Sequence, residues 1–506
     1  MRSAVGDGRP VGYFRVPGRI VSDFCTRRWQ RGWLLAVFAL FMHGCTLGPD
    51  YQRPAVELPD QYVDDASVAG SSQELLVAAD WWQAFDDPLL TELVRAAFEH
   101  NADLQQAIAT VERADALLKE VGASLWPEIG GSGLASRTRL SEKAGQVATG
   151  TSAVRSSFRV AAAASFELDF WGRLRRAREA ALAQALASRY ARDTVALSLA
   201  GGVAQNYVAL RALDAQIAVS RQMLDNRQRT RRLIHDRYAG GIASPLEVQQ
   251  AEVLFSTAAA QLADLVRQRF LIESQLGLLT GQPDLRLHAG ELQALPLPPM
   301  PPSGLPSALL EARPDVRQAE AQLIAANANI GVAKAALFPA ISLTGSLGSE
   351  SRALSDLFSS GAGVWSLGSR LDLPLFDAGR RSARVEQADA VQQEALAAYV
   401  GAVRNAFRDV NDALVIIRQT AEIEQALDAG MRAAREALRL AEIRYEAGYS
   451  PFLEVLDAQR TANDTELAYI RNRQDRLSAS ILLFKALGGG WQEGVWQGMA
   501  SGDDEA

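Results

Sequence analysis

The chain of 506 residues carries one sequence unit twice. Residues 237–241 (RYAGG) align with residues 444–448 (RYEAG), and the segment LWPEI at 125–129 corresponds to LFPAI at 337–341. The matches keep the same order in both halves, which chance does not readily produce. A duplication of this kind predicts a fold with internal pseudo-symmetry.

The two copies meet at a proline-rich connector. Six of the eleven residues at 296–306 are Pro, which predicts a stiff, extended segment. We therefore divide the chain at this point and at its two termini. The expected parts are a lipoprotein signal peptide at 1–44, an extended segment at 45–80, a first repeat at 81–290, a connector at 291–312, a second repeat at 313–490 and a disordered tail at 491–506.

The N-terminus has the pattern of a secretory signal. Residues 1–44 contain seven Arg and two acidic residues, and an apolar run at 33–42 ends just before Gly44 and Cys45. This run is too short to span a bilayer. A Cys directly after the small residue predicts lipidation of Cys45 (palmitate on a bacterial lipoprotein), and Thr46 favours sorting to the outer membrane. A simple signal peptide with an incidental Cys is the alternative, and the first 24 residues are compatible with an over-extended start.

Each repeat contains a long segment with the pattern of a coiled-coil helix. Residues 173–239 lack Pro, and their apolar residues recur at spacings that are sums of three and four. Residues 380–447 repeat the plan, and a Gly ends each segment at Gly240 or Gly448, suited to a left-handed helix cap. A second helix is expected to follow each turn, so that helical hairpins cover 173–281 and 380–488. A cytoskeletal or scaffold coiled coil would give the same pattern.

Strand patterns argue against a simple coiled coil. Apolar residues occupy every second position over 158–170, and Arg159, Glu167 and Asp169 lie on the opposite face. Long strands with this alternation are typical of outer-membrane barrels. A soluble sheet with one wet face is the alternative, and the export signal makes it the weaker one. The expected strands lie at about 126–140, 157–170, 339–349 and 363–376.

Four strands are too few to close a barrel. A closed barrel takes about eight strands, and a water-filled channel takes more. An open sheet edge in hydrocarbon would leave backbone groups without hydrogen bonds. Several chains must therefore share one barrel. Three chains would give twelve strands and a lumen, although two or four chains also give an even number.

Composition excludes several other classes of protein. The net charge of -7, without a basic block, disfavours nucleic acid as a partner. Four His and two Cys argue against a zinc cage or a disulfide framework. The sequence contains no HExxH, P-loop or GxSxG motif, so we expect no enzyme activity, no metal site and no cofactor. The acidic pair at 64–65 and the three acidic residues at 503–505 are interpreted as solvated charge.

Several motifs resemble the outer-membrane factor family of tripartite efflux pumps, in particular its OprM/NodT-like lipoprotein branch, which is related to TolC. The resemblance runs from Cys45 to about Trp491. It implies a mainly α fold with membrane β structure: a homotrimeric 12-stranded β-barrel, with four strands per chain, continuous with a long periplasmic α-helical barrel. The implied partners are a periplasmic adaptor protein and an inner-membrane transporter. The motifs are CTLGPDYQRP at 45–54, DWW at 80–82, the two Arg-Tyr-x-x-Gly turns, LEVLDAQR at 453–460 and FKALGGGW at 484–491.

The resemblance also implies two sets of functional residues. In the family the Gly-containing turns form the periplasmic tips, where the adaptor docks, and a Leu and an Asp just past the second tip narrow the pore. Gln249 and Gln250 stand where the second repeat has Leu456 and Asp457, so only the second hairpin is expected to line the constriction. An ordinary solvated helix face with an ion pair is the alternative for the gate residues. The expected docking tips are Gly240, Gly241, Pro245, Gly448, Ser450 and Pro451, and the expected periplasmic gate is Leu453, Asp457, Glu454 and Arg460.

Three functions fit these observations. The first is a passive outer-membrane duct that exports small toxic molecules such as drugs, drawn by an inner-membrane pump. The second is an outer-membrane duct for type I protein secretion, and the third is a structural coiled-coil lipoprotein that tethers the envelope. The lipoprotein signal and the OprM-like motifs favour the first. The exported substrate stays open, because a passive duct offers no selective pocket to read in a sequence.

Overall fold

The computed structural model describes residues 46–59, 62, 77–141, 143, 152–300 and 309–491. Cys45 and the signal segment lie outside these residues, and so do residues 492–506. The chain divides into two compact units. A sheet unit contains Pro127–Arg175 and Phe338–Pro374, and a helical unit contains the described parts of Gly48–Trp126 and Arg176–Leu337 and the chain from Leu375 onward. Each repeat contributes to both units.

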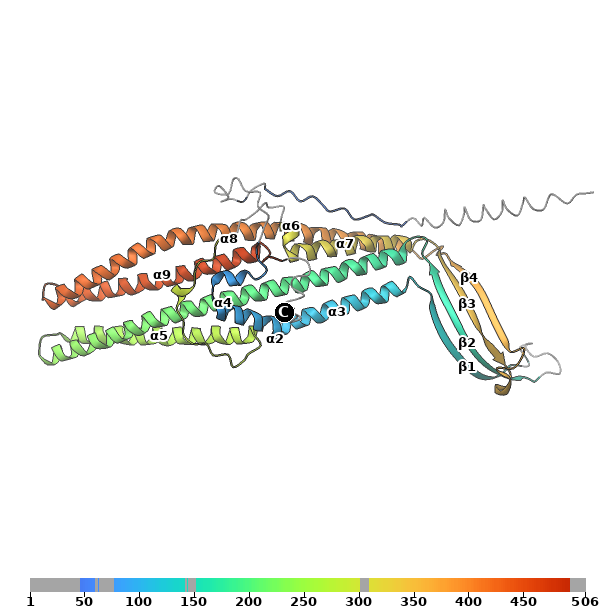
Figure 1. The fold of residues 1–506 in the computed structure, drawn as a ribbon, viewed down its shortest axis with the longest axis horizontal. Coiled ribbons are helices and arrows are strands. Elements are labelled where there is room, and N and C mark those ends of the chain that lie inside the picture. The colour runs from blue at the N-terminus through green and yellow to red at the C-terminus, as the bar shows by residue number, and fades with distance from the viewer. Residues whose placement is uncertain are drawn as a thin grey trace, which may run out of the picture. The chain divides into compact units, whose positions relative to one another are not determined.

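The sheet unit holds one antiparallel sheet with the strand order β1-β2-β3-β4 (Figure 1). Leu347 of β3 lies opposite Trp365 of β4, and the neighbouring pair places the hydroxyls of Ser346 and Ser366 2.8 Å apart. Because successive residues of a strand point to opposite faces, this part of the sheet has one apolar and one polar face. The strands are β1 (Glu128–Arg139), β2 (Val154–Leu168), β3 (Ala340–Ser351) and β4 (Gly363–Asp372).

Two strand ends differ from the sequence expectation by three residues or more. β2 begins at Val154 rather than at 157, because Val154 still pairs with Arg139 at the far end of β1. β4 ends at Asp372 rather than at 376. Pro374 explains the second difference, since proline has no backbone N–H to donate to a neighbouring strand.

The sheet is open at both edges in the single chain. Among the described residues, β1 pairs only with β2 and β4 pairs only with β3. The apolar side chains are also uncovered: Trp365 is 78% exposed and Leu347 is 70% exposed. An isolated chain therefore presents two rows of unpaired backbone groups beside an apolar face, which is unfavourable in water and in lipid.

The helical unit repeats the same series of helices. α4 and α8 each have 67 residues, and α5 and α9, which follow them after a tight turn, each have 35. No helix of the described residues is long and apolar enough to cross a membrane. The helices are α2 (Pro88–His100), α3 (Ala102–Ala123), α4 (Arg173–Ala239), α5 (Pro245–Leu279), α6 (Leu309–Ala312), α7 (Pro314–Ala335), α8 (Arg380–Glu446) and α9 (Phe452–Ala486).

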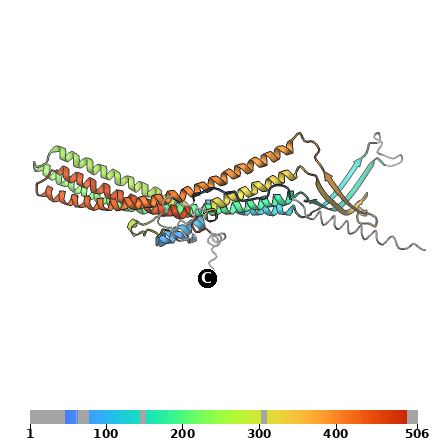
Figure 2. The same ribbon diagram turned by 90° about the horizontal axis from the view of Figure 1, so that it is seen from above.

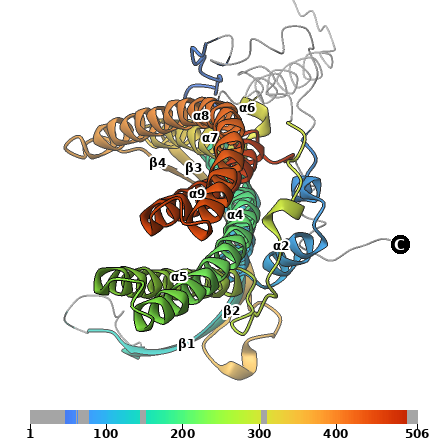
Figure 3. The same cartoon turned by 90° about the vertical axis from the view of Figure 1, so that its left-hand side faces the viewer.

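The two hairpins, α4–α5 and α8–α9, run side by side, and their turns lie at the same end of the helical unit (Figure 2). At a rise of 1.5 Å per residue, α4 and α8 are each about 100 Å long. Seen from the turns, α5 and α9 lie on the same side of the unit, and α2 lies on the opposite side of α4 (Figure 3). The two return helices therefore face a common space near the turns.

The core of the helical unit lies where both repeats meet α2 and the short 3-10 helix η2 (Trp81–Phe85). Trp81, which is 2% exposed, stacks on Phe484 of α9 with ring centroids 5.4 Å apart. Tyr207 of α4 donates a hydrogen bond to Asp87 at 2.5 Å, and burial together with this bond raises the pKa of Tyr207 to about 12. The coiled-coil pattern of α4 is also explained, because its spaced residues Tyr190, Leu197, Tyr207, Leu210 and Ile217 are all buried.

The segment that follows Cys45 lies along α7. Pro49 accepts a hydrogen bond from Asn327 through its carbonyl oxygen at 2.9 Å. Arg53 pairs with Glu320 and Glu311, both at 2.6 Å, and its hydrogen bond lowers the pKa of Glu311. The described residues of the motif at 45–54 thus have a structural role, since Pro49 and Arg53 bond to the helical unit.

Candidate gate and docking surface at the hairpin tips

The two hairpin turns have the same backbone geometry. Gly241 and Gly448 both adopt the left-handed conformation, with φ of 74° and 77°. The N–H groups of the next residues, Ile242 and Tyr449, each donate to a carbonyl in the last turn of the preceding helix at 2.8 Å. This is a Schellman ending, which favours Gly at the left-handed position. The left-handed residue of the first turn is therefore Gly241 and not Gly240, because Gly241 is the residue that matches Gly448 in the repeat.

Two exposed apolar side chains project from these turns. Ile242 and Tyr449 occupy the same position in the two repeats, and each is 80% exposed. Sequence analysis did not single them out, although the repeat alignment places an apolar residue after each left-handed Gly. Gly240, Pro245 and Pro451 are also exposed. The described residues offer no hydrogen-bond partner to the buried Ser450 hydroxyl.

The first residues of α5 and α9 are held in different ways. Ser244 caps α5: its hydroxyl accepts from the Glu247 N–H at 3.3 Å, and Glu247 accepts from the Ser244 N–H at 2.6 Å. Pro451 stands at the equivalent position before α9 and makes no side-chain cap. Phe452, the first residue of α9, is instead buried, and its ring centroid lies 5.3 Å from that of Tyr445.

An apolar cluster joins the two hairpins just behind the turns. We call it the tip cluster. It is bordered by Arg237 of α4, which donates to the Tyr445 hydroxyl of α8 and lies 4.9 Å above the same ring. Both repeats thus contribute to one small core. Its buried members are Ile234, Val248, Ala251, Ala441, Phe452, Val455 and Leu456.

The structure brings some of the expected gate residues together. Asp457 accepts a hydrogen bond from Arg460 at 2.7 Å, and both side chains are well exposed. Leu453, one turn before Asp457 on α9, is 67% exposed. Glu454 lies apart from this pair and approaches Arg444 of α8 at 3.9 Å. An exposed pair of this kind adds little stability by itself.

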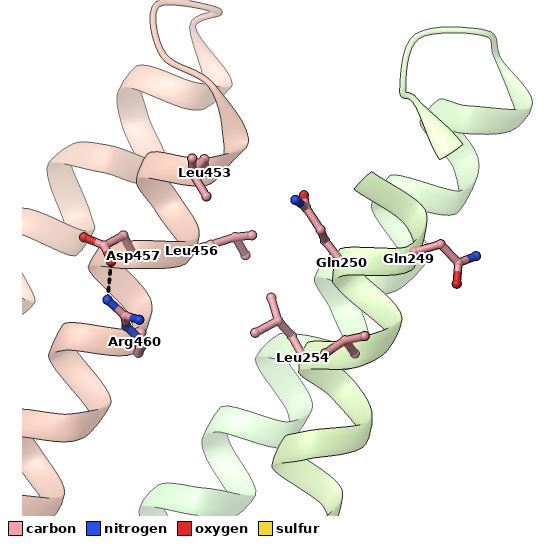
Figure 4. Close-up of a pocket in the computed structure, with 8 residues that line it drawn as sticks. Gln249, Gln250, Leu254, Leu453, Leu456, Asp457 and Arg460 are labelled. Carbon is pink, nitrogen blue, oxygen red and sulfur yellow. Dashed lines mark hydrogen bonds and ion pairs between the residues drawn. The ribbon is translucent and has the colours of Figure 1, made fainter. Parts of the chain in front are cut away.

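A cavity of about 410 Å³ separates α9 from α5 beside these residues (Figure 4). We call it the gate pocket. Leu456 projects across the gap from α9 toward Gln250 and Leu254 of α5, and the Asp457–Arg460 bond lies on the α9 side (Figure 4). Sequence analysis placed Leu456 only by its match to Gln249 and did not identify it as a pocket residue. The pocket is lined by Gln249, Gln250, Val253, Leu254, Leu453, Leu456, Asp457 and Arg460.

Behind the pocket, a buried arginine crosses from the first hairpin to the second. Arg227 of α4 is 5% exposed and donates to the side-chain oxygen of Gln459 on α9 at 2.7 Å. Burial lowers the pKa of Arg227, because the charged form loses hydration. The acceptor is neutral, so this contact holds the hairpins together without a full ion pair.

The structure tests for a metal site but does not describe the predicted lipidation site. Across the described ranges, no group of three or more His, Cys, Asp or Glu side chains is arranged to hold a metal ion. The predicted lipidation site, Cys45, lies outside those ranges.

Comparison with known proteins identifies the family. Residues 93–282 and 305–489 match the family described as "Outer membrane efflux protein". The chain is 37% identical over 468 residues to outer membrane protein OprJ of Pseudomonas aeruginosa, covering 90% of this chain and 95% of OprJ. It is 35% identical over 462 residues to the solvent efflux pump outer membrane protein SrpC of Pseudomonas putida, covering 90% of this chain and 98% of SrpC.

A solved structure agrees with these matches. The open state of the Neisseria gonorrhoeae MtrE outer membrane channel superimposes with a TM-score of 0.79 at 34% identity, covering 88% of this chain and 98% of MtrE. The family resemblance drawn from the motifs is confirmed, and so is the mainly helical fold class with a four-stranded sheet per chain. The chain belongs to the outer membrane efflux protein family and is an outer-membrane efflux channel.

Proposed function

We propose that three copies of this chain form the outer-membrane duct of a tripartite efflux pump. The duct passively carries small toxic molecules from a periplasmic adaptor and an inner-membrane transporter to the exterior. The observation that carries the proposal is the open four-stranded sheet in a chain of this family. The chain acts as a conduit and catalyses no reaction.

The trimer follows from the need to pair the sheet edges. β1 and β4 can each bond to a neighbouring copy, so that three sheets close into twelve strands. The exposed Leu347 and Trp365 would then face lipid. Closure removes the two unpaired edges at once, which a single chain cannot do.

The adaptor docks at the hairpin tips. Gly240, Gly241 and Pro245 form the first tip, and Gly448, Ser450 and Pro451 form the second. Exposed apolar side chains beside these turns support the assignment, since Ile242 and Tyr449 offer surface that a partner can cover.

Leu453 and Asp457 form the constriction in the trimer, with Glu454 and Arg460 beside them. Three copies of Leu453 would meet near the axis and exclude water, and three Asp457–Arg460 pairs would surround them. The absence of an equivalent Leu–Asp pair in the first hairpin, which has Gln250 at the position of Asp457, supports a gate made by the second hairpin alone.

Lipid anchoring completes the proposal. Cleavage after Gly44 exposes Cys45, whose acyl chains insert into the outer membrane while the helical hairpins stand in the periplasm. The attachment of Arg53 to Glu311 and Glu320 supports this arrangement, because it fixes the chain start close behind the anchor.

Deletion of the gene tests the exported class. We expect the deletion strain to lose resistance to lipophilic drugs or solvents, and we expect the wild-type chain to restore it. SrpC, a solvent efflux protein by name, supports this class. Unchanged susceptibility together with loss of a secreted polypeptide would instead establish the protein-secretion duct.

A further inference from the structure

The gate pocket has the size of a ligand site. Its volume of about 410 Å³ lies within the range of pockets that hold small molecules. Its walls come from α5 and α9, which belong to different repeats. Any molecule inside it therefore touches both hairpins.

Most of the pocket wall is apolar, and part of this apolar surface is exposed to solvent in the single chain. In the single chain Val253 is 63% exposed, and Leu254, Leu456 and Leu453 complete the apolar wall. Leu453 also belongs to the proposed constriction, so Val253 is the wall residue that the site depends on most. An apolar molecule that covers these side chains removes their surface from water, which favours binding.

The polar side chains that line the pocket disfavour a bound molecule with a net charge. Among the described residues that line it, Asp457 and Arg460 are the ionisable ones, and they neutralise each other at 2.7 Å. The amide of Gln250 points toward the gap (Figure 4) and can donate or accept one hydrogen bond. This wall suits a molecule without net charge that carries at most one polar group.

A second cavity, lined by residues of α4, α5 and α9, differs from the gate pocket in the polarity of its wall. It has a volume of about 590 Å³ and is larger than the gate pocket. Its wall, however, includes Gln216, Gln261, Asp264, Gln268, Arg471 and Gln474, so it suits water better than an apolar molecule.

We propose that the gate pocket binds one small, uncharged lipophilic molecule per chain. The assignment of the exported compound as its natural occupant rests on the proposed function. Leu456 belongs both to the pocket wall and to the tip cluster, so the occupant contacts the core that joins the hairpins. A bound molecule favours the hairpin separation seen here over any other separation, because it binds that state more tightly.

Binding of N-phenyl-1-naphthylamine, an uncharged probe that fluoresces in apolar surroundings, tests the proposal on the purified full chain in detergent, with the fluorescence of the same micelles without protein subtracted at each probe concentration. Val253→Asn places an amide in the pocket wall. Val266→Asn makes the same change at an exposed position of α5 outside it. We expect saturable binding, one probe per chain, to wild type and Val266→Asn, and at least tenfold weaker binding to Val253→Asn. Equal affinity of the two variants, or no saturable binding to wild type, would overturn the proposal.

Two further arms sharpen the result. Gln250→Trp fills the pocket with an indole and should abolish binding whether or not Val253→Asn alters the fold; retained binding would overturn the site. The anionic analogue 8-anilinonaphthalene-1-sulfonate should bind wild type at least tenfold more weakly than the uncharged probe. Equal affinity for both probes would overturn the assigned ligand class.

Complementation of the deletion strain separates this inference from the proposed function. Restored resistance without saturable probe binding overturns the gate pocket as a ligand site and leaves the duct intact. Saturable binding without restored resistance overturns the proposed export of small molecules and supports the site alone.

Discussion

The first hairpin, α4–α5, and the second hairpin, α8–α9, have equal lengths and the same Schellman turn, yet their return helices start differently. α5 starts with a local cap made by Ser244 and Glu247. α9 has Pro451 at that place and buries Phe452 in the tip cluster. The start of α5 is thus held by a local cap, and the start of α9 is held by burial of an aromatic ring in a cluster that both hairpins share.

This difference shows how a duplication can separate two roles. A helix start that is fixed by a local cap can serve as a fixed support, whereas a helix start that is fixed only by burial in a shared cluster can change position when that cluster is disturbed. The proposed gate residues lie on the second hairpin, where Leu453 directly follows Phe452 and Asp457 lies about one turn further along α9. Because the repeats align, a substitution in one repeat has a matched control at the corresponding position of the other.

The largest effect should come from the gate itself. Leu453→Ala combined with Asp457→Ala should raise single-channel conductance in planar bilayers several-fold, because the apolar and charged groups at the constriction are removed. Leu246→Ala changes the residue that matches Leu453 in the first hairpin and should leave conductance unchanged. An unchanged double variant, or an equal rise in the control, would place the constriction elsewhere.

Removing the aromatic ring that anchors α9 should have the next largest effect. Phe452 is 6% exposed, so Phe452→Ala should cost about 3 kcal/mol of local stability at the second tip. Hydrogen exchange of amides in the first turns of α9 measures this loss. Pro245→Ala, at the matching exposed position, should change exchange far less. Similar protection of the second tip in both variants would show that Phe452 does not hold it.

A carboxylate beside the buried arginine should tighten the contact between the hairpins. Gln459→Glu turns the 2.7 Å contact with Arg227 into an ion pair and should stabilise the contact between the hairpins by about 1.5 kcal/mol. Glu442, which accepts from the Gln459 amide at 3.5 Å, is exposed, so solvent screens its repulsion of the new carboxylate. Tip amides should then exchange more slowly. Glu252→Gln, at the matching position, removes an ion pair with Arg231 inside the first hairpin and should loosen only the α4–α5 contact. Faster exchange in Gln459→Glu would contradict the role of Arg227.

The smallest effect should come from the helix cap. Ser244→Ala removes the cap of α5 and should cost about 1 kcal/mol, seen as faster exchange in its first turn. Pro451→Ala, at the position that makes no side-chain cap, should not produce this loss in α9. Equal losses at both positions would remove the distinction between the two tips.

Periodicity and repetition in the sequence were enough to predict the main architecture. The period of two in 158–170 became part of β2, and the spacing of Tyr190, Leu197 and Tyr207 became the buried side of α4. These patterns depend on neighbouring residues, which a sequence displays directly. Asp457 and Arg460 are likewise close in sequence, and their separation of three residues brings the two side chains together on one helix face.

Contacts between distant segments could not be predicted in the same way. Arg227 and Gln459 lie in different repeats, and no spacing rule connects them. The gate pocket has the same origin, since Leu254 and Leu456 approach only after both hairpins have folded. The choice between Gly240 and Gly241 needed backbone angles, because adjacent glycines give the same composition signal.

The number of chains in the particle tests the central claim most directly. Native mass measurement of the purified chain in detergent should give a complex of three copies, and the same sample should form discrete channels in planar bilayers. A stable particle of one chain that stays in solution without detergent would contradict the account, because the edges of β1 and β4 would then need no neighbour.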